Sequence, residues 1–93
     1  FDQFKLLRSD NIADRWILFP NPVNDVITIG VPKSISSFYF QIYDLTGRLH
    51  DNGNATVNTS KVYRISANNL KTGYYLASIR HQNGNEILKF YKE

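Results

Sequence analysis

The feature that most constrains the fold of this chain is an Asn-Gly pair at residues 83–84, set between two runs rich in apolar residues. A two-residue hairpin turn of type I′ needs positive φ at both central positions, which Asn and Gly tolerate best. The pair therefore predicts an antiparallel hairpin whose strands cover residues 74–82 and 86–92.

Centring the turn on this pair also predicts the register of the hairpin. One face of the two strands is apolar and is expected to face the core: Tyr75, Ala77, Ile79, Leu88 and Phe90, with Ile79 opposite Leu88 and Ala77 opposite Phe90. The other face is more polar and pairs Ser78 with Lys89 and Arg80 with Ile87. Burial on one side only is typical of an antiparallel sheet.

The rest of the chain repeats the pattern of a short strand followed by turn residues. Strands are expected at residues 16–19, 26–31, 38–45 and 61–66, with a short one from Arg48 that turns at Asn52-Gly53. The first strand stops at Pro20, which cannot donate to a ladder, so it should lie at a sheet edge. About seven short strands predict an all-β, immunoglobulin-like antiparallel β-sandwich. Two segments are expected: a linker or partly ordered lead-in at 1–15 and the sandwich at 16–93.

Composition excludes several classes of protein. The 93 residues suffice for about one domain, and the net charge of +3 comes from scattered basic residues, unlike the clustered stripe of a nucleic-acid binder. No cysteine is present, and no apolar run approaches the ~20 residues of a transmembrane helix. Because the chain begins without Met, we expect it to be a fragment of a longer protein.

No pattern predicts catalysis, a cofactor or a metal site. His50 and His81 are isolated, and His81 is expected to form an exposed cross-strand pair with Glu86 beside the hairpin turn. The run Asp51–Asn54 has calcium-loop character but lacks the remaining ligand positions, so a plain turn is favoured. We therefore expect a protein that is not an enzyme.

Aromatic residues leave a second interpretation open. Six of them could line a sugar-binding platform: Trp16, Tyr39, Tyr43, Tyr63, Tyr74 and Tyr91. Aromatic side chains on half-buried strands more often pack in the core or across strands, and that interpretation is favoured. An immunoglobulin- or fibronectin-like accessory module that binds glycan or a surface protein remains the alternative function.

Four segments in order resemble the C-terminal sorting domain of type IX secretion substrates, the Por secretion system sorting domain of type A found in Bacteroidetes. They are "LFPNPVNDVITI" (18–29), "FQIYDLTGRLH" (40–50), "YRISANNLKTGYYLASI" (63–79) and "ILKFYKE" (87–93). The matching motif positions are Pro20, Asn21, Pro22, Asp44, Leu45, Gly47, Arg48, Leu70, Gly73, Tyr75, Ile79, Lys89 and Lys92. The chain departs from the family in ending Tyr91-Lys92-Glu93, where many members end in a run of lysines.

The resemblance implies a sorting signal carried at the C-terminus of a larger exported protein. It implies passage through the periplasm and the type IX outer-membrane machinery to the cell surface or medium, followed by removal of the tail by a sortase-like surface protease. The expected partners are that machinery, the protease and an N-terminal cargo domain. A cleavage site in or before residues 8–17 would fit an exposed linker.

Physical chemistry divides the motif residues into two groups. Gly47, Gly73 and Leu70 are expected to serve the fold, since turns need glycine and a loop leucine needs burial. Arg48 and the terminal lysines are expected to be exposed and available for recognition. The last strand is also a candidate for docking by strand addition at a sheet edge.

Overall fold

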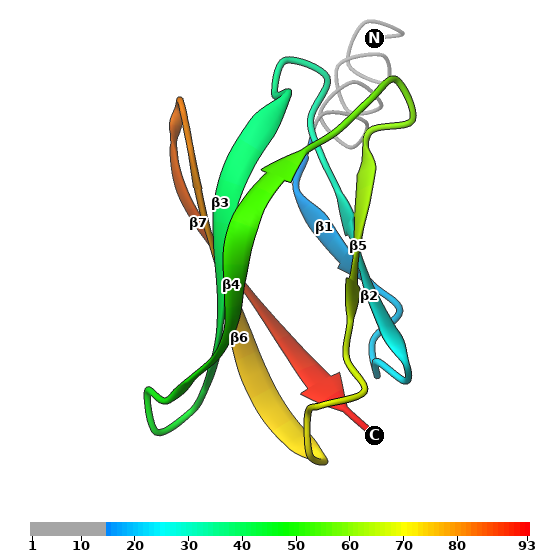
Figure 1. Ribbon diagram of the computed structural model, residues 1–93, viewed down its shortest axis with the longest axis vertical. Coiled ribbons are helices and arrows are strands. Elements are labelled where there is room, and N and C mark those ends of the chain that lie inside the picture. The colour runs from blue at the N-terminus through cyan, green and yellow to red at the C-terminus, as the bar shows by residue number, and fades with distance from the viewer. Residues whose placement is uncertain (1–14) are drawn as a thin grey trace, which may run out of the picture.

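The computed structural model describes residues 15–93, so the lead-in predicted at 1–15 lies, apart from Arg15, outside the described residues. These residues form seven strands (Figure 1). Their bounds are β1 Ile17–Phe19, β2 Val26–Gly30, β3 Ser37–Asp44, β4 Leu49–Thr56, β5 Val62–Ser66, β6 Gly73–His81 and β7 Gly84–Lys92. Within the described part of the chain, no helix is long and apolar enough to span a membrane.

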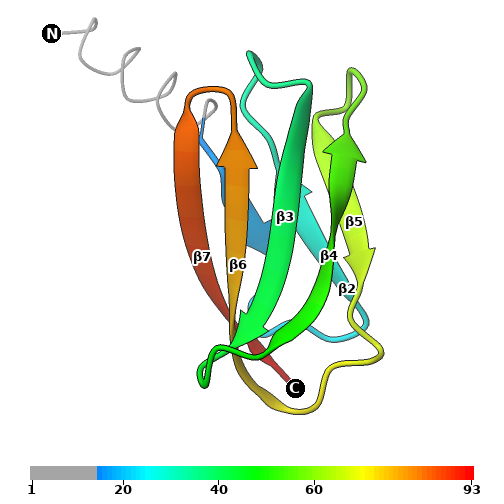
Figure 2. The same cartoon turned by 60° about the vertical axis from the view of Figure 1, so that its left-hand side comes forward.

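The strands form two antiparallel sheets that face each other (Figure 2). One sheet has the order β1-β2-β5 and the other has the order β4-β3-β6-β7. The predicted all-β sandwich of about seven strands is confirmed. The edge position predicted for the first strand is also confirmed, because β1 pairs only with β2.

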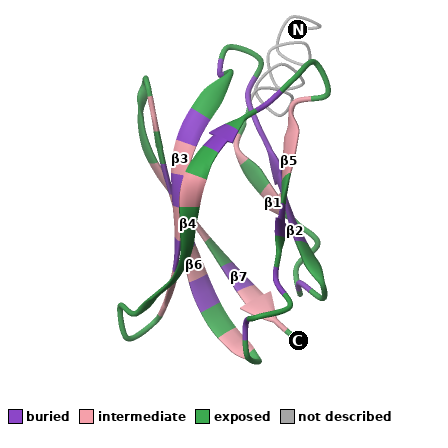
Figure 3. Ribbon diagram, viewed as in Figure 1, coloured by how far each residue is buried: buried purple, intermediate pink, exposed green. Residues whose placement is uncertain are grey.

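The core lies between the two sheets, and buried residues alternate along β3 and β6, whereas β2 is buried at four consecutive residues (Figure 3). Ile27 and Ile29 of β2 face Ile42 of β3 and Ile79 of β6, and all four are fully buried. Phe90 of β7 is 1% exposed, and its ring stacks on that of Tyr75 at 5.6 Å between centroids. Burial of apolar surface is the main stabilising term for such a thin sandwich.

The hairpin of β6 and β7 forms as predicted, but its register differs by two residues. The central turn residues are Gln82 and Asn83, and His81 pairs with Gly84. Ala77 is therefore opposite Leu88 and not Phe90. Gly84 has a φ of 143°, whereas Lys61 is the only non-glycine among the described residues with positive φ, so Asn83 does not adopt the type I′ conformation.

The predicted core face of the hairpin is correct although its predicted register is wrong. A register shift of two residues preserves which side chains share a face, because the side-chain period of a strand is two. Tyr75, Ala77 and Ile79 are buried, together with Phe90. Pairing across the strands is decided by the turn, whereas the choice of face is decided by the apolar pattern.

The turn predicted at Asn52-Gly53 is wrong, because β4 continues through it to Thr56. Gly53 pairs with Phe40, and a Cβ at residue 53 would lie 3.2 Å from the Phe40 ring. Pairing with β3 continues through both residues, and glycine at residue 53 leaves the space that the Phe40 ring occupies.

Candidate recognition site

Loops far apart in the sequence meet at one end of the sandwich. These are the β1–β2 loop (20–25), the β3–β4 turn (45–48) and the β5–β6 loop (67–72), and the chain ends beside them at Glu93 (Figures 1 and 2). We call this end the motif pole. Of the predicted motif positions, all except Lys89 and Ile79 lie in its loops or in the strand residues next to them.

The Pro-Asn-Pro segment joins the start of the sandwich to its last strand. Asn21 Oδ1 accepts a hydrogen bond from the backbone N–H of Tyr91 at 3.0 Å. Val23 donates to the Tyr91 carbonyl at 2.7 Å and accepts from the Glu93 N–H at 2.9 Å, which makes a parallel bridge to Lys92. These three bonds cover the C-terminal end of the β7 edge.

The hydrogen bonds of Asn21 and Val23 to the end of β7 limit where a partner strand could add to this edge, as predicted for the last strand. In an antiparallel pair, alternate residues direct their N–H and C=O groups away from the partner strand. Because Tyr91 directs its groups to Asn21 and Val23, the same alternation directs those of Asn85, Ile87 and Lys89 outward. No described residue forms a hydrogen bond with these outward-directed N–H and C=O groups. Only this part of the β7 edge is therefore open to strand addition.

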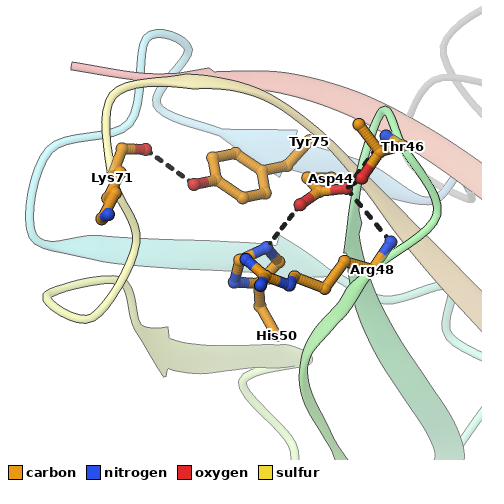
Figure 4. A network of polar contacts seen from close by, with 6 residues as sticks. All are labelled: Asp44, Thr46, Arg48, His50, Lys71 and Tyr75. Carbon is orange, nitrogen blue, oxygen red and sulfur yellow. Dashed lines mark hydrogen bonds and ion pairs between the residues drawn. The ribbon is translucent and has the colours of Figure 1, made fainter.

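Asp44 organises the β3–β4 turn (Figure 4). Its Oδ1 accepts hydrogen bonds from the Thr46 N–H at 2.9 Å, the Thr46 hydroxyl and the Arg48 N–H at 3.1 Å. The Thr46 hydroxyl bond and then the His50 contact hold the pKa of Asp44 well below its ordinary value. Gly47 has a φ of 91° at the point where the chain reverses, a conformation that disfavours residues with a side chain.

His50 connects this turn to the β5–β6 loop. The register of β3 and β4 shifts between Ile42 and Tyr43, which leaves His50 as the extra residue of a bulge. His50 Nε2 lies 2.8 Å from Asp44 Oδ2, and because an ionised carboxylate only accepts, Nε2 donates. The His50 ring packs edge-on against Tyr75, whose hydroxyl donates to the Lys71 carbonyl at 2.7 Å.

The motif residues therefore have different surroundings. Several are engaged within the fold: Asn21, Asp44, Leu70 and Tyr75, of which Leu70 is 8% and Tyr75 4% exposed. Leu45 is 58% exposed, and Pro20, Pro22 and Arg48 are also exposed. The burial predicted for Leu70 and the exposure predicted for Arg48 are confirmed.

The two lysines of the last strand differ in exposure and in contacts. Lys89 is exposed, and its Nζ lies 4.8 Å from the centre of the Tyr74 ring. Lys92 is half-buried, and its Nζ donates to the carbonyl of Glu93 at 2.9 Å. The exposure predicted for the terminal lysines is therefore confirmed for Lys89 only.

Sequence reasoning missed the roles of Thr46 and His50. The signal for Thr46 was its place two residues after Asp44, the spacing at which an aspartate accepts from the backbone in an Asx turn. No sequence signal marked His50, because its contact with Asp44 depends on the bulge.

The prediction for His81 is correct in its partner and wrong in its exposure. His81 Nε2 lies 3.2 Å from Glu86 Oε2, but its side chain is only 5% exposed and packs on Trp16. Glu86 is opposite Ile79 in the observed register, and the alternation of each strand places both polar side chains on the inner face in either register. In the described part of the chain, no three potential metal-ligating side chains gather.

The aromatic residues also divide. Trp16 and Tyr63 pack against the core, where each makes an edge-on contact with Phe38. The register places the remaining four on the outer face of the four-stranded sheet: Tyr39, Tyr43, Tyr74 and Tyr91. The favoured interpretation, packing in the core or across strands, is therefore confirmed in the core for Trp16 and Tyr63 and across strands for Tyr74 and Tyr91. Tyr39 and Tyr43 lie outside the core.

The fold and the organised pole define a class of protein: a small immunoglobulin-like β-sandwich module. A protein of the DUF3244 family from Bacteroides vulgatus, with an immunoglobulin-like β-sandwich fold, superimposes with a TM-score of 0.69 at 17% identity over 86% of both chains. Dimeric latent PorU from Porphyromonas gingivalis superimposes with a TM-score of 0.56 at 25% identity. That match covers 83% of this chain and 9% of PorU.

Residues 17–93 match the family described as the secretion system C-terminal sorting domain. The chain belongs to this family. No curated protein sequence matches the chain. The family consists of C-terminal sorting signals for type IX secretion, so the predicted sorting function is confirmed. Membership implies the type IX machinery and a cargo domain as partners, and export to the cell surface or medium.

Proposed function

We propose that the secretion machinery recognises this domain as a folded module and that the motif pole is part of the recognised surface. The observation that carries the proposal is the convergence of the Pro-Asn-Pro, Asp-Leu-Thr-Gly-Arg and Leu-Lys-Thr-Gly-Tyr segments with the end of the last strand. These segments meet only in the folded chain. A partner that binds the motif pole therefore distinguishes the folded domain from the unfolded one.

Two exposed side chains of the β3–β4 turn are the proposed contacts. Leu45 and Arg48 project from a turn whose backbone the Asp44 hydrogen bonds fix, so little backbone conformational entropy remains to be lost on binding. Among the described residues, no ion-pair partner holds the Arg48 guanidinium. An exposed apolar side chain beside an unpaired guanidinium suits a protein surface that presents an apolar pocket and a carboxylate.

The proposed route follows the family. The cargo with its tail crosses the periplasm and passes the outer-membrane machinery, and a sortase-like surface protease then removes the tail. Cleavage in or before residues 8–17 would separate the cargo from the sandwich without breaking any strand of the described fold. The domain itself contributes binding and no catalysis, as befits a family of sorting signals.

The test is an export assay with a fluorescent reporter fused to residues 1–93 in a host that has type IX secretion. Arg48→Glu and Leu45→Ser are expected to reduce the exported fraction by about tenfold, the size typical of a binding hot spot. Arg64→Glu makes the same charge change on the exposed side of β5 and is the matched control. Normal export of both pole variants would contradict the role of the pole, and failure of the unaltered fusion would contradict sorting itself.

A further inference from the structure

The outer face of the four-stranded sheet is divided into two chemically different halves. Near the β6–β7 hairpin it is polar, with Asn54, Tyr39 and Arg80 in one cross-strand row. Toward the motif pole the cross-strand rows are apolar and hold Tyr43, Leu49, Tyr74, Leu76 and Tyr91. Ile87 adjoins them on β7, in a middle row whose other members are polar: Ser78, Gln41 and Asn52. We call these six apolar residues the apolar outer patch, and they lie on the face that the sequence predicted only as the more polar of the two.

The patch exposes large side chains to solvent. Ile87 is 60%, Tyr74 52% and Leu49 44% exposed, and they belong to three different strands of the sheet. Tyr74 packs edge-on against Tyr91 at 4.9 Å between ring centroids. Contiguous exposed apolar side chains on a soluble domain mark interaction sites, whereas single exposed ones do not.

Charge on this face is of one sign. Lys89 stands within the patch with its Nζ over the Tyr74 ring, and Arg80 lies in the polar half. The carboxylates of the described residues lie elsewhere, in the β1–β2 loop, at the motif pole, on the inner face or at the chain end: Asp25, Asp44, Asp51, Glu86 and Glu93. The face therefore offers apolar area with positive charge and no negative charge.

These features disfavour a second copy of this domain as the occupant. Two such patches face to face would bring one Lys89 toward the other with no carboxylate to offset the repulsion. Strands about 4.8 Å apart and residues about 3.4 Å apart give the patch a base of roughly 200 Å². A stable interface buries about 800 Å² per partner, so the patch alone is too small for one and any partner must also contact neighbouring surface.

We propose that the apolar outer patch docks a protein partner whose own surface is apolar and carries acidic side chains. The patch is continuous with the motif pole, because Tyr74 follows Gly73 and Tyr91 precedes Lys92. A single partner can therefore contact both and reach the area that a specific interface needs. This inference rests on the proposed function and assigns the partner a second contact surface, with Tyr74 and Ile87 as its anchors and Lys89 as its charged contact.

The reporter fusion tests the proposal with matched variants. Tyr74→Thr and Ile87→Thr remove the apolar groups and keep a residue that favours strands, and Tyr39→Thr makes the same kind of change in the polar half. Lys89→Glu reverses the charge in the patch, and Arg80→Glu is its control. We expect the patch variants to lose about tenfold or more of the exported reporter, and the controls to export normally.

Two further measurements keep the outcome of the export assay unambiguous. Thermal unfolding of each purified variant should match that of the parent domain, so that lost export reports lost docking. If the unaltered fusion is exported and the folded patch variants are exported equally well, the docking proposal is overturned while sorting stands. A photo-crosslinking residue at position 87 should yield a partner adduct, mapped by mass spectrometry to an apolar segment with Asp or Glu. An adduct between two copies of this domain would overturn the choice of partner.

Discussion

Asn21→Ala tests whether the Pro-Asn-Pro segment holds the last strand in place. The substitution removes the acceptor of the Tyr91 N–H and leaves the two backbone bonds of Val23 in place. A side chain to backbone hydrogen bond contributes about 0.5–1.5 kcal/mol to the free energy of unfolding. For a domain of 60–100 residues, 1 kcal/mol corresponds to about 4–8 °C in Tm. We therefore expect Asn21→Ala to lower Tm by about 2–12 °C.

Hydrogen exchange measured by NMR locates the effect. The Tyr91 amide should lose protection, and the Glu93 amide should follow because the bridge to Val23 is adjacent. Amides in the middle of β3 should lose protection only to the extent that the global stability of the domain falls.

Two variants control this experiment. Asn21→Asp keeps an oxygen acceptor and should restore the protection of the Tyr91 amide. Asn24→Ala makes the same deletion in the same exposed loop, at a side chain without a described hydrogen-bond partner. The reasoning is refuted if the Tyr91 amide stays fully protected in Asn21→Ala, or if Asn24→Ala causes the same loss.

Substitutions at three further positions test the fold. The hydrogen bond from the Thr46 hydroxyl, followed by the His50 contact, lowers the pKa of Asp44, so its stabilising effect is present above the ordinary pKa of 3.8 and is lost as the pH falls below it. Denaturant titrations should therefore show the stability gap between the parent and Asp44→Asn narrowing from about pH 5 to about pH 2. Phe90→Ala should cost about 3–5 kcal/mol, measured by urea unfolding, and a cost below about 1 kcal/mol would argue against its burial. Gly47→Ala should cost about 1–2 kcal/mol, and Gly47→Asn less, because Asn tolerates a φ of 91°.

Local chemistry made much of the fold predictable. Alternation of apolar residues in β6 and β7 identifies Tyr75, Ala77, Ile79 and Phe90 as the core face, since the period of two is a property of the strand itself. Pro20 ends the first strand and predicts its edge position because proline lacks an N–H group. The resemblance of the four motif segments predicted the family because their order and spacing are properties of the linear chain.

Competing local signals produced the errors. Asn83-Gly84 favours one turn register, yet the pairing that forms is displaced by two residues, and the difference between two registers with the same buried face is small. Asn52-Gly53 favours a turn, but pairing along β3 continues past it. Turn propensity depends on only a few residues, whereas strand pairing is stabilised by a whole ladder of hydrogen bonds.

The sequence by itself determined most of the strands, the buried face of the last hairpin and the family to which the chain belongs, because these follow from side-chain period, turn chemistry and motif order. Only the tertiary structure decided that the motif segments meet at one pole, that Asn21 holds Tyr91 across 70 residues, and that His50 bonds to Asp44. It also decided that exposed Tyr74, Ile87 and Leu49 lie together on one sheet face. Those contacts depend on which strands become neighbours, and pairing between distant segments is fixed by the packing of the whole sandwich.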